Sequence, residues 1–128
     1  MSSFPTDLRY THDHEWLRAQ GTAWRVGITQ FAVDALGDIT LVDLPKEGDQ
    51  VTKGQRFGTV ESVKSVSDLY APVSGKVVAV NAALKDSPEQ VNAEPYGTGW
   101  MIDIEPNEKA EVDELLDAKA YTAHVAAQ

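Results

Sequence analysis

Hydrophobic and polar residues alternate in short runs over most of the first 80 positions of this chain. The clearest runs cover 24–28, 39–44, 56–62 and 75–80, and turns containing glycine or proline separate them. A period of two places successive side chains on opposite faces of a strand. Short strands punctuated by glycine are typical of compact sandwiches and barrels, so the pattern predicts a mainly β protein.

Two further strands are expected, over 12–17 and over 100–104. In the first, alternation would place four ring-bearing side chains on one face, namely Tyr10, His12, His14 and Trp16. In the second, the apolar residues again recur at every other position. Both segments therefore fit strands that bury one face.

Short helices are expected between and after the strands. Thr29 is a favourable N-cap residue for a helix that Gly37 would end. The segment 81–92 predicts a helix or helical turn that Pro88 interrupts. The segment from about 107 to 126 has apolar residues at helical spacing, which predicts a helical C-terminal tail.

The chain is acidic, and its charge is uneven. Its 128 residues include 11 Lys and Arg against 20 Asp and Glu, a formal net charge of −9. Residues 81–128 hold three basic and ten acidic residues of that total. This balance argues against nucleic acid and anionic membranes as partners. Because there is no cysteine, disulfides, Cys-ligated metal sites and thiol nucleophiles are excluded.

The length fits a single domain over 1–128. No apolar run approaches the roughly 18–20 residues that a membrane-spanning helix needs. Residues 1–7 lack the charged and apolar regions of a signal peptide and the arginines of a transit peptide. We therefore expect a cytoplasmic protein of a bacterial cell, or a mitochondrial matrix protein only if a transit peptide has been removed.

The first candidate for chemistry is a pair of histidines, His12 and His14, whose i, i+2 spacing would point both rings to one side of a strand. A catalytic zinc normally takes three protein ligands. The remaining histidine, His124, would complete a set only if the tail folded back. Surface histidines beside Trp16 are the simpler interpretation, and we expect no metal site.

The second candidate is Lys64, which stands between short neighbours in what reads as a hairpin between two strands, over about 56–75. An exposed lysine is usually only a solvated turn residue. The tip of a hairpin is nonetheless the place where covalent attachment of a swinging cofactor requires a lysine, because a modifying enzyme must reach the amine. The spacing alone leaves both interpretations open.

The segment Glu61-Ser62-Val63-Lys64, followed by Ser67 to Gly75, resembles the lipoylation segment of the glycine cleavage system H protein family. The resemblance extends along almost the whole chain. The other matching segments, in the family's order, are Leu8-Arg9-Tyr10, His14-Glu15-Trp16, Val26-Gly27-Ile28-Thr29, Ala35-Leu36-Gly37-Asp38, Leu44-Pro45, Gly48-Asp49, Val91-Asn92, Pro95-Tyr96-Gly97, Gly99-Trp100 and Leu115-Leu116.

The resemblance implies a lipoyl-domain-like fold, a hybrid of β-barrel and sandwich, with lipoic acid bound to Lys64 as an amide. It implies a carrier and not an enzyme. The partners would be glycine decarboxylase (P protein), which loads an aminomethyl group, aminomethyltransferase (T protein), which removes it, and dihydrolipoyl dehydrogenase (L protein), which reoxidises the arm. A lipoate ligase or a lipoyl/octanoyl transferase would attach the cofactor.

Four other functions remain open at this stage. The one from a different class is a small metal-dependent enzyme built on His12 and His14. A lipoyl module of a 2-oxoacid dehydrogenase would have the same fold, although such modules usually adjoin flexible linkers. A similar chain could serve lipoate delivery. A biotin carrier is a poorer match, because methionines typically flank its lysine and here Val63 and Ser65 do.

The loaded arm would need shelter, because loss of the amine in water releases formaldehyde. The cargo ends in an amine that is cationic near neutral pH, so carboxylates are the expected acceptors. We expect Glu15 first and Asp68 second, with His14 as part of the wall of a cleft. The alternative is that both carboxylates are ordinary solvated groups.

Overall fold

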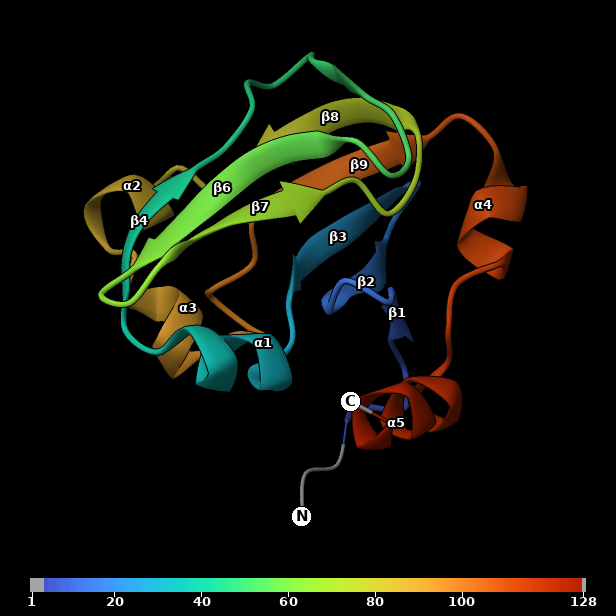
Figure 1. The fold of residues 1–128 in the computed structure, drawn as a ribbon. Helices are drawn as coiled ribbons and strands as arrows, with labels where there is room; N and C mark the ends of the chain where they lie inside the picture. Colours follow the sequence, from blue (N-terminus) through green and yellow to red (C-terminus); the bar gives the residue numbers. More distant parts are fainter. Residues whose placement is uncertain (1–3, 128) are drawn as a thin grey trace.

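The computed structural model describes residues 4–127 (Figure 1). The prediction that residues 1–7 form neither a signal peptide nor a transit peptide falls partly on residues 1–3, which lie outside the described residues. The strands are β1 Arg9–Tyr10, β2 Glu15–Gln20, β3 Ala23–Ile28, β4 Ile39–Asp43, β5 Gln50–Val51, β6 Arg56–Ser62, β7 Val66–Tyr70, β8 Gly75–Val80 and β9 Ile102–Pro106. The helices are α1 Gln30–Leu36, α2 Ala83–Asp86, α3 Gln90–Ala93, α4 Lys109–Asp113 and α5 Ala118–Ala126.

Two antiparallel sheets form the body of the molecule. The larger has the order β1-β2-β3-β9-β8-β5 and the smaller has the order β4-β6-β7. Figure 1 shows β6 and β7 lying across β8, β9 and β3. The expectation of a mainly β protein with a helical C-terminal segment is confirmed.

One hydrophobic core joins the sheets. Val26 and Ile28 of the larger sheet lie in the same buried cluster as Val42, Val60 and Leu69 of the smaller one. Each of these residues comes from a run of alternating polarity, so one face of each strand supplies the core. A second cluster, built on Trp16, Tyr10 and Tyr121, joins the first strands to α5.

Helix α1 forms where its cap residues predicted it. The Thr29 side chain accepts a hydrogen bond from the Ala32 N–H at the start of α1, and Gly37 ends that helix with a φ of 80°. The positive φ favours glycine at this position. Residues 81–92 form two short helices on either side of Pro88, as expected.

The expected strand over 12–17 is wrong. The chain turns at residues 11–14, and the strand begins only at Glu15. The hydroxyl of Thr11 accepts hydrogen bonds from the backbone N–H groups of Asp13 and Glu15, and His14 takes a φ of 70°. Local side-chain bonds of this kind compete with strand pairing, which is why alternation misled here.

The last strand is also displaced from its expected place. It runs over Ile102–Pro106 instead of 100–104. Trp100 precedes it, in a connection where the Trp100 N–H donates to the Gly97 carbonyl at 3.1 Å. The Asn81 amide donates to the carbonyls of Thr98 and Trp100 and so fixes this connection beside the end of β8.

Candidate functional site

Lys64 lies exposed in the turn between β6 and β7. Ser62 holds this turn: its hydroxyl oxygen accepts from the backbone N–H groups of Lys64 and Ser65, both at 3.2 Å. The Ser62 N–H also donates to the Ser65 carbonyl at 2.8 Å. The backbone on both sides of the lysine is therefore held by hydrogen bonds, while the residue itself is exposed.

The tip of this hairpin is also attached to the end of α1. The Val63 N–H donates to the Asp38 carbonyl at 3.1 Å. The end of the Lys64 side chain lies close to Gly37, since a Cβ at that glycine would lie 3.1 Å from Lys64 Cε and 3.7 Å from its Nζ. Figure 1 shows the β6–β7 turn at the same end of the molecule as α1, α2 and α3. Residues distant in sequence thus fix the position of the lysine.

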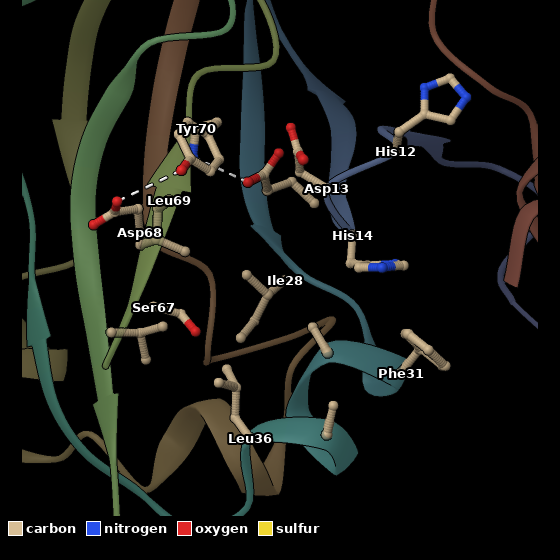
Figure 2. Close-up of a pocket in the computed structure, with 14 residues that line it drawn as sticks. His12, Asp13, His14, Ile28, Phe31, Leu36, Ser67, Asp68, Leu69 and Tyr70 are labelled. Carbon is tan, nitrogen blue, oxygen red and sulfur yellow. Dashed lines mark hydrogen bonds between the residues drawn. The ribbon is translucent and has the colours of Figure 1, made fainter. Parts of the chain in front are cut away.

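A cleft of about 450 Å³ lies beside the hairpin strand β7. Its lining includes Ser67 to Tyr70 of β7, Phe31 and Leu36 of α1, and the turn that precedes β2. Figure 2 shows Asp68 and Tyr70 on one side, His14 and Asp13 on the other, and Ile28 between them. Because Ser67 is three residues from Lys64, a chain attached to the lysine could enter the cleft along β7.

Glu15 is among the residues that line this cleft and is only 2% exposed. Its Oε1 accepts from the Thr11 hydroxyl at 2.8 Å and its Oε2 accepts from the Tyr70 N–H at 3.1 Å. Burial raises the pKa of Glu15 from 4.5 to about 8, against the lowering effect of these two bonds. The alternative that Glu15 is a solvated carboxylate is therefore wrong.

His14 forms part of the cleft wall. Its Nδ1 lies 2.8 Å from the hydroxyl of Tyr121, which in turn lies 2.8 Å from the hydroxyl of Thr29. Its ring packs against Phe31 with 4.6 Å between the centroids. Burial raises the pKa of Tyr121 to about 12, so its hydroxyl stays protonated at neutral pH. This network joins β2, α1 and α5 around the cleft.

Asp68 is on the cleft rim, and its side chain is 45% exposed. Arg56 lies 3.8 Å from it, and the Tyr70 hydroxyl donates to it at 3.5 Å. Exposed ion pairs of this kind contribute about 0–1 kcal/mol. The structure therefore brings Glu15, Asp68 and His14 to one cleft, but in different environments.

The C-terminal tail does fold back onto the first histidines. The rings of His12 and His124 lie 4.7 Å apart, and those of His14 and His124 lie 5.6 Å apart. His124 Nε2 lies 3.1 Å from the His12 carbonyl, so that nitrogen carries a hydrogen directed at a backbone oxygen. Within residues 4–127 no group of three or more His, Cys, Asp or Glu side chains is arranged to hold a metal ion.

The sequence analysis did not identify two residues that form hydrogen bonds with the cleft residues Glu15 and His14. Thr11, which bonds to Glu15, is followed two residues later by Asp13, and this local turn signal could have identified it. Tyr121 reaches His14 across 107 positions of sequence, and no local pattern indicates that contact.

Comparison of the whole chain with known proteins shows its family. The family model described as glycine cleavage H-protein matches residues 8–128. The chain belongs to the glycine cleavage H-protein family. Among relatives, the glycine cleavage system H protein of Myxococcus xanthus is 54% identical over 121 residues, covering 94% of each chain. That of Anoxybacillus flavithermus is 57% identical over 119 residues, covering 93% of this chain and 94% of the relative.

The family likeness extends to an archaeon and to a solved structure. The probable glycine cleavage system H protein of Haloarcula marismortui is 55% identical over 117 residues, covering 91% of this chain and 92% of the relative. The crystal structure of a glycine cleavage system H protein from Mycobacterium marinum superimposes with a TM-score of 0.88 at 44% identity. It covers 96% of this chain and 99% of that one. The expected lipoyl-domain-like fold, a hybrid of barrel and sandwich, is confirmed.

Proposed function

We propose that this chain is the lipoyl-bearing carrier of a glycine cleavage system, with the lipoyl group bound to Lys64 as an amide. The observation that carries the proposal is the position of Lys64. It is exposed at a hydrogen-bonded hairpin tip, next to a cleft that begins three residues away. Membership of the H-protein family supports the role.

The residues present fit a lipoyl arm. The cleft beside β7 has apolar side chains from α1, among them Phe31 and Leu36, and polar side chains such as Glu15 and Asp68. When attached, the lipoyl group supplies a disulfide that can be reduced to two thiols, a chemistry that this cysteine-free chain does not itself contain. The chain acts as a carrier, because its own residues position and shelter the cargo.

The polar groups of the cleft suit an aminomethyl cargo with a cationic amine. Glu15 has a pKa of about 8 and is largely protonated at neutral pH. A cation placed beside it would favour the ionised form, so Glu15 would release its proton as the cargo enters. Asp68 would attract the amine at the rim, and His14 would close one wall and keep water out.

Its partners would be the enzymes that load, unload and reoxidise the arm: glycine decarboxylase, aminomethyltransferase and dihydrolipoyl dehydrogenase. A lipoate ligase or a lipoyl/octanoyl transferase would attach it. The relatives from bacteria and an archaeon support a cytoplasmic location. Within the described residues, no helix has the length and apolar character to cross a membrane.

The test measures both the attachment of lipoate to the chain and the glycine-dependent turnover that the chain supports. The chain, Lys64→Arg and the control Lys53→Arg are incubated with lipoate ligase, ATP and lipoate, and then mapped by peptide mass. We expect one modified residue, Lys64, in the wild type and in Lys53→Arg, and none in Lys64→Arg, since arginine keeps the charge but cannot form the amide. With the three enzymes, the wild type and Lys53→Arg should support glycine-dependent turnover, and Lys64→Arg should not.

Modification of another lysine in the wild type would contradict the proposed attachment site. Modification of Lys64 without glycine-dependent turnover would contradict the glycine cleavage role. It would leave the two alternatives, a 2-oxoacid dehydrogenase module and lipoate delivery.

A further inference from the structure

The hydroxyl group of Thr11 makes every hydrogen bond that it can make. Its oxygen accepts from the backbone N–H groups of Asp13 at 3.2 Å and of Glu15 at 3.1 Å. A hydroxyl has two lone pairs and one proton, and an N–H group can only donate. Both lone pairs are therefore occupied, and the single proton is directed at the Glu15 Oε1, which lies 2.8 Å away. Thr11 donates to Glu15 whether that carboxyl is ionised or not.

Two fixed donors thus hold the Glu15 carboxyl group. The Thr11 hydroxyl donates to Oε1, and the Tyr70 N–H donates to Oε2 at 3.1 Å. The torsion that sets the plane of a glutamate carboxyl is intrinsically soft, so these two bonds decide its orientation. Thr11 and Glu15 are only 9% and 2% exposed, which leaves water little part in this arrangement.

Thr11 lies on the side of Glu15 that faces away from the cleft beside β7. Glu15 lines that cleft and also a second cavity of about 270 Å³, whereas Thr11 lines only the second cavity. The second cavity has room for several water molecules, and Lys53 is among its lining residues. Without the bond from Thr11, the Glu15 carboxyl could turn toward this water and this cation.

The groups around Glu15 leave Thr11 as the side chain to test. Burial and the charge of Asp13 raise the pKa of Glu15, and the Thr11 hydroxyl is the side chain that lowers it. The Tyr70 N–H also lowers it but belongs to the backbone. The other titratable groups that line the two cavities or act on Glu15 are His12, His14, Lys53, Asp68, Tyr70, Glu114 and Tyr121.

We propose that Thr11 is a positioning residue for the carried cargo: its hydroxyl holds the Glu15 carboxyl where it accepts the cationic amine of the loaded arm. Thr11 acts through Glu15, because it does not line the cleft that would hold the arm. This inference rests on the proposed function, since it takes this cleft as the resting place of the loaded arm.

Four substitutions test the hydroxyl. Thr11→Val keeps the side-chain shape and removes the donor, and Thr11→Ser keeps the donor. Thr11→Asp keeps an oxygen that can accept from the backbone N–H two residues later, but cannot donate once ionised. Thr22→Val is the matched control. It makes the same change beyond the other end of β2, where the hydroxyl lies 3.5 Å from Glu105 Oε2.

The first measurement uses the chain without lipoate. The carboxyl carbon NMR signal of Glu15, assigned by its absence in Glu15→Gln, is followed against pH. The midpoint should lie near pH 8 in the wild type and about one pH unit higher in Thr11→Val, because a hydrogen bond to a charged group stabilises the ionised form strongly. Thr11→Asp should also raise the midpoint, whereas Thr11→Ser and Thr22→Val should leave it near the wild-type value.

The second measurement follows formaldehyde released from the loaded chain at pH 8 with no partner enzyme present. Thr11→Val should release it about 2- to 5-fold faster than the wild type, because less of its Glu15 is ionised. Thr11→Ser and Thr22→Val should release it at the wild-type rate.

The Glu15→Gln background separates positioning from a general loosening of the turn. Thr11→Val also removes the acceptor of two backbone N–H groups, although the Thr11 N–H still donates to the Glu15 carbonyl at 3.0 Å. If Thr11 acts through the Glu15 charge, adding Thr11→Val to Glu15→Gln should change formaldehyde release less than 1.5-fold. A loosened turn would speed release by the same factor in both backgrounds.

The outcomes against the inference differ from those against the proposed function. A Glu15 midpoint that stays unchanged in Thr11→Val or Thr11→Asp, or an equal factor in both backgrounds, would overturn the inference and leave the proposed function standing. If wild-type chain takes no lipoate on Lys64, or loses formaldehyde as fast as free aminomethyl-dihydrolipoamide does, the proposed function fails and this inference fails with it.

Discussion

The carboxyl group of Glu15 accepts a hydrogen bond from the backbone N–H of Tyr70 across 3.1 Å. This bond joins the start of β2 to the end of β7, the second strand of the hairpin that bears Lys64. The same carboxyl accepts from Thr11 on its other oxygen. One buried titratable group therefore connects the start of β2 with the hairpin that bears Lys64.

Stability should fall with rising pH through Glu15. Its pKa is about 8 in the folded chain and 4.5 as an ordinary carboxyl group, so between these values the folded state binds the extra proton. The free energy of unfolding should therefore decrease from pH 4.5 to pH 8, by at most about 1.4 kcal/mol per pH unit from this group. Urea unfolding of the wild type and Glu15→Gln across this range measures the difference.

Glu15→Gln cannot ionise and should lack this part of the slope. Glu47→Gln is the matched control, because it makes the same substitution at an exposed position. Parallel pH profiles for the wild type and Glu15→Gln would show that Glu15 ionises normally in the folded chain.

Cargo retention should depend on Glu15 more than on Asp68. With the arm loaded and no partner enzyme present, Glu15→Gln should release formaldehyde several-fold faster than the wild type, since a buried charge partner is worth more than an exposed one. Asp68→Asn should change release less than twofold. The measurement is formaldehyde trapped over time from the loaded protein.

The ratio of the formaldehyde release rate of Glu15→Gln to that of the wild type should be greater at pH 8 than at pH 5.5. The reason is that ionised Glu15 is the form that pairs with the cationic amine. Equal release rates at both pH values would mean that Glu15 does not shelter the cargo.

Tyr121→Phe should destabilise the protein through the polar network around His14. The hydroxyl lies 2.8 Å from both His14 Nδ1 and Thr29 Oγ1, and Tyr121 is fully buried. Removing it leaves buried polar atoms with fewer partners, at a cost of about 1–3 kcal/mol. Tyr70→Phe is the matched control, because its hydroxyl makes only a 3.5 Å contact at the rim. Equal thermal stability of the two variants would contradict the role given to the network.

Gly27→Ala should destabilise the fold by overpacking. A Cβ at this position would lie 2.6 Å from the indole of Trp16, which is fully buried and donates its Nε1–H to the Pro95 carbonyl. Forcing a methyl group into such a space costs about 1–3 kcal/mol. Combining it with Trp16→Phe should cost less than the sum of the two single changes, because the smaller ring leaves room. Strict additivity in urea unfolding would argue against the contact.

Several features of this protein follow from local sequence alone. The alternating runs from 56 to 80 become β6, β7 and β8 because strand pairing and burial act on the same side chains. Thr29 caps α1 because its hydroxyl needs only the next turn of backbone. The exposed position of Lys64 follows in the same way, since a tip between two strands leaves its side chain outside both sheets.

The environment of the cleft was decided by tertiary structure. Glu15 is one of 20 acidic residues, and nothing in its neighbours in sequence distinguishes a buried carboxyl with a raised pKa from a solvated one. Its Oε2 finds a hydrogen-bond donor only because β7, 55 positions later, supplies the Tyr70 N–H. Likewise, His14 meets Tyr121 only after α5 packs against the first strands. The desolvation of a group depends on all the elements that pack around it and exclude water, and these elements come together only in the folded chain.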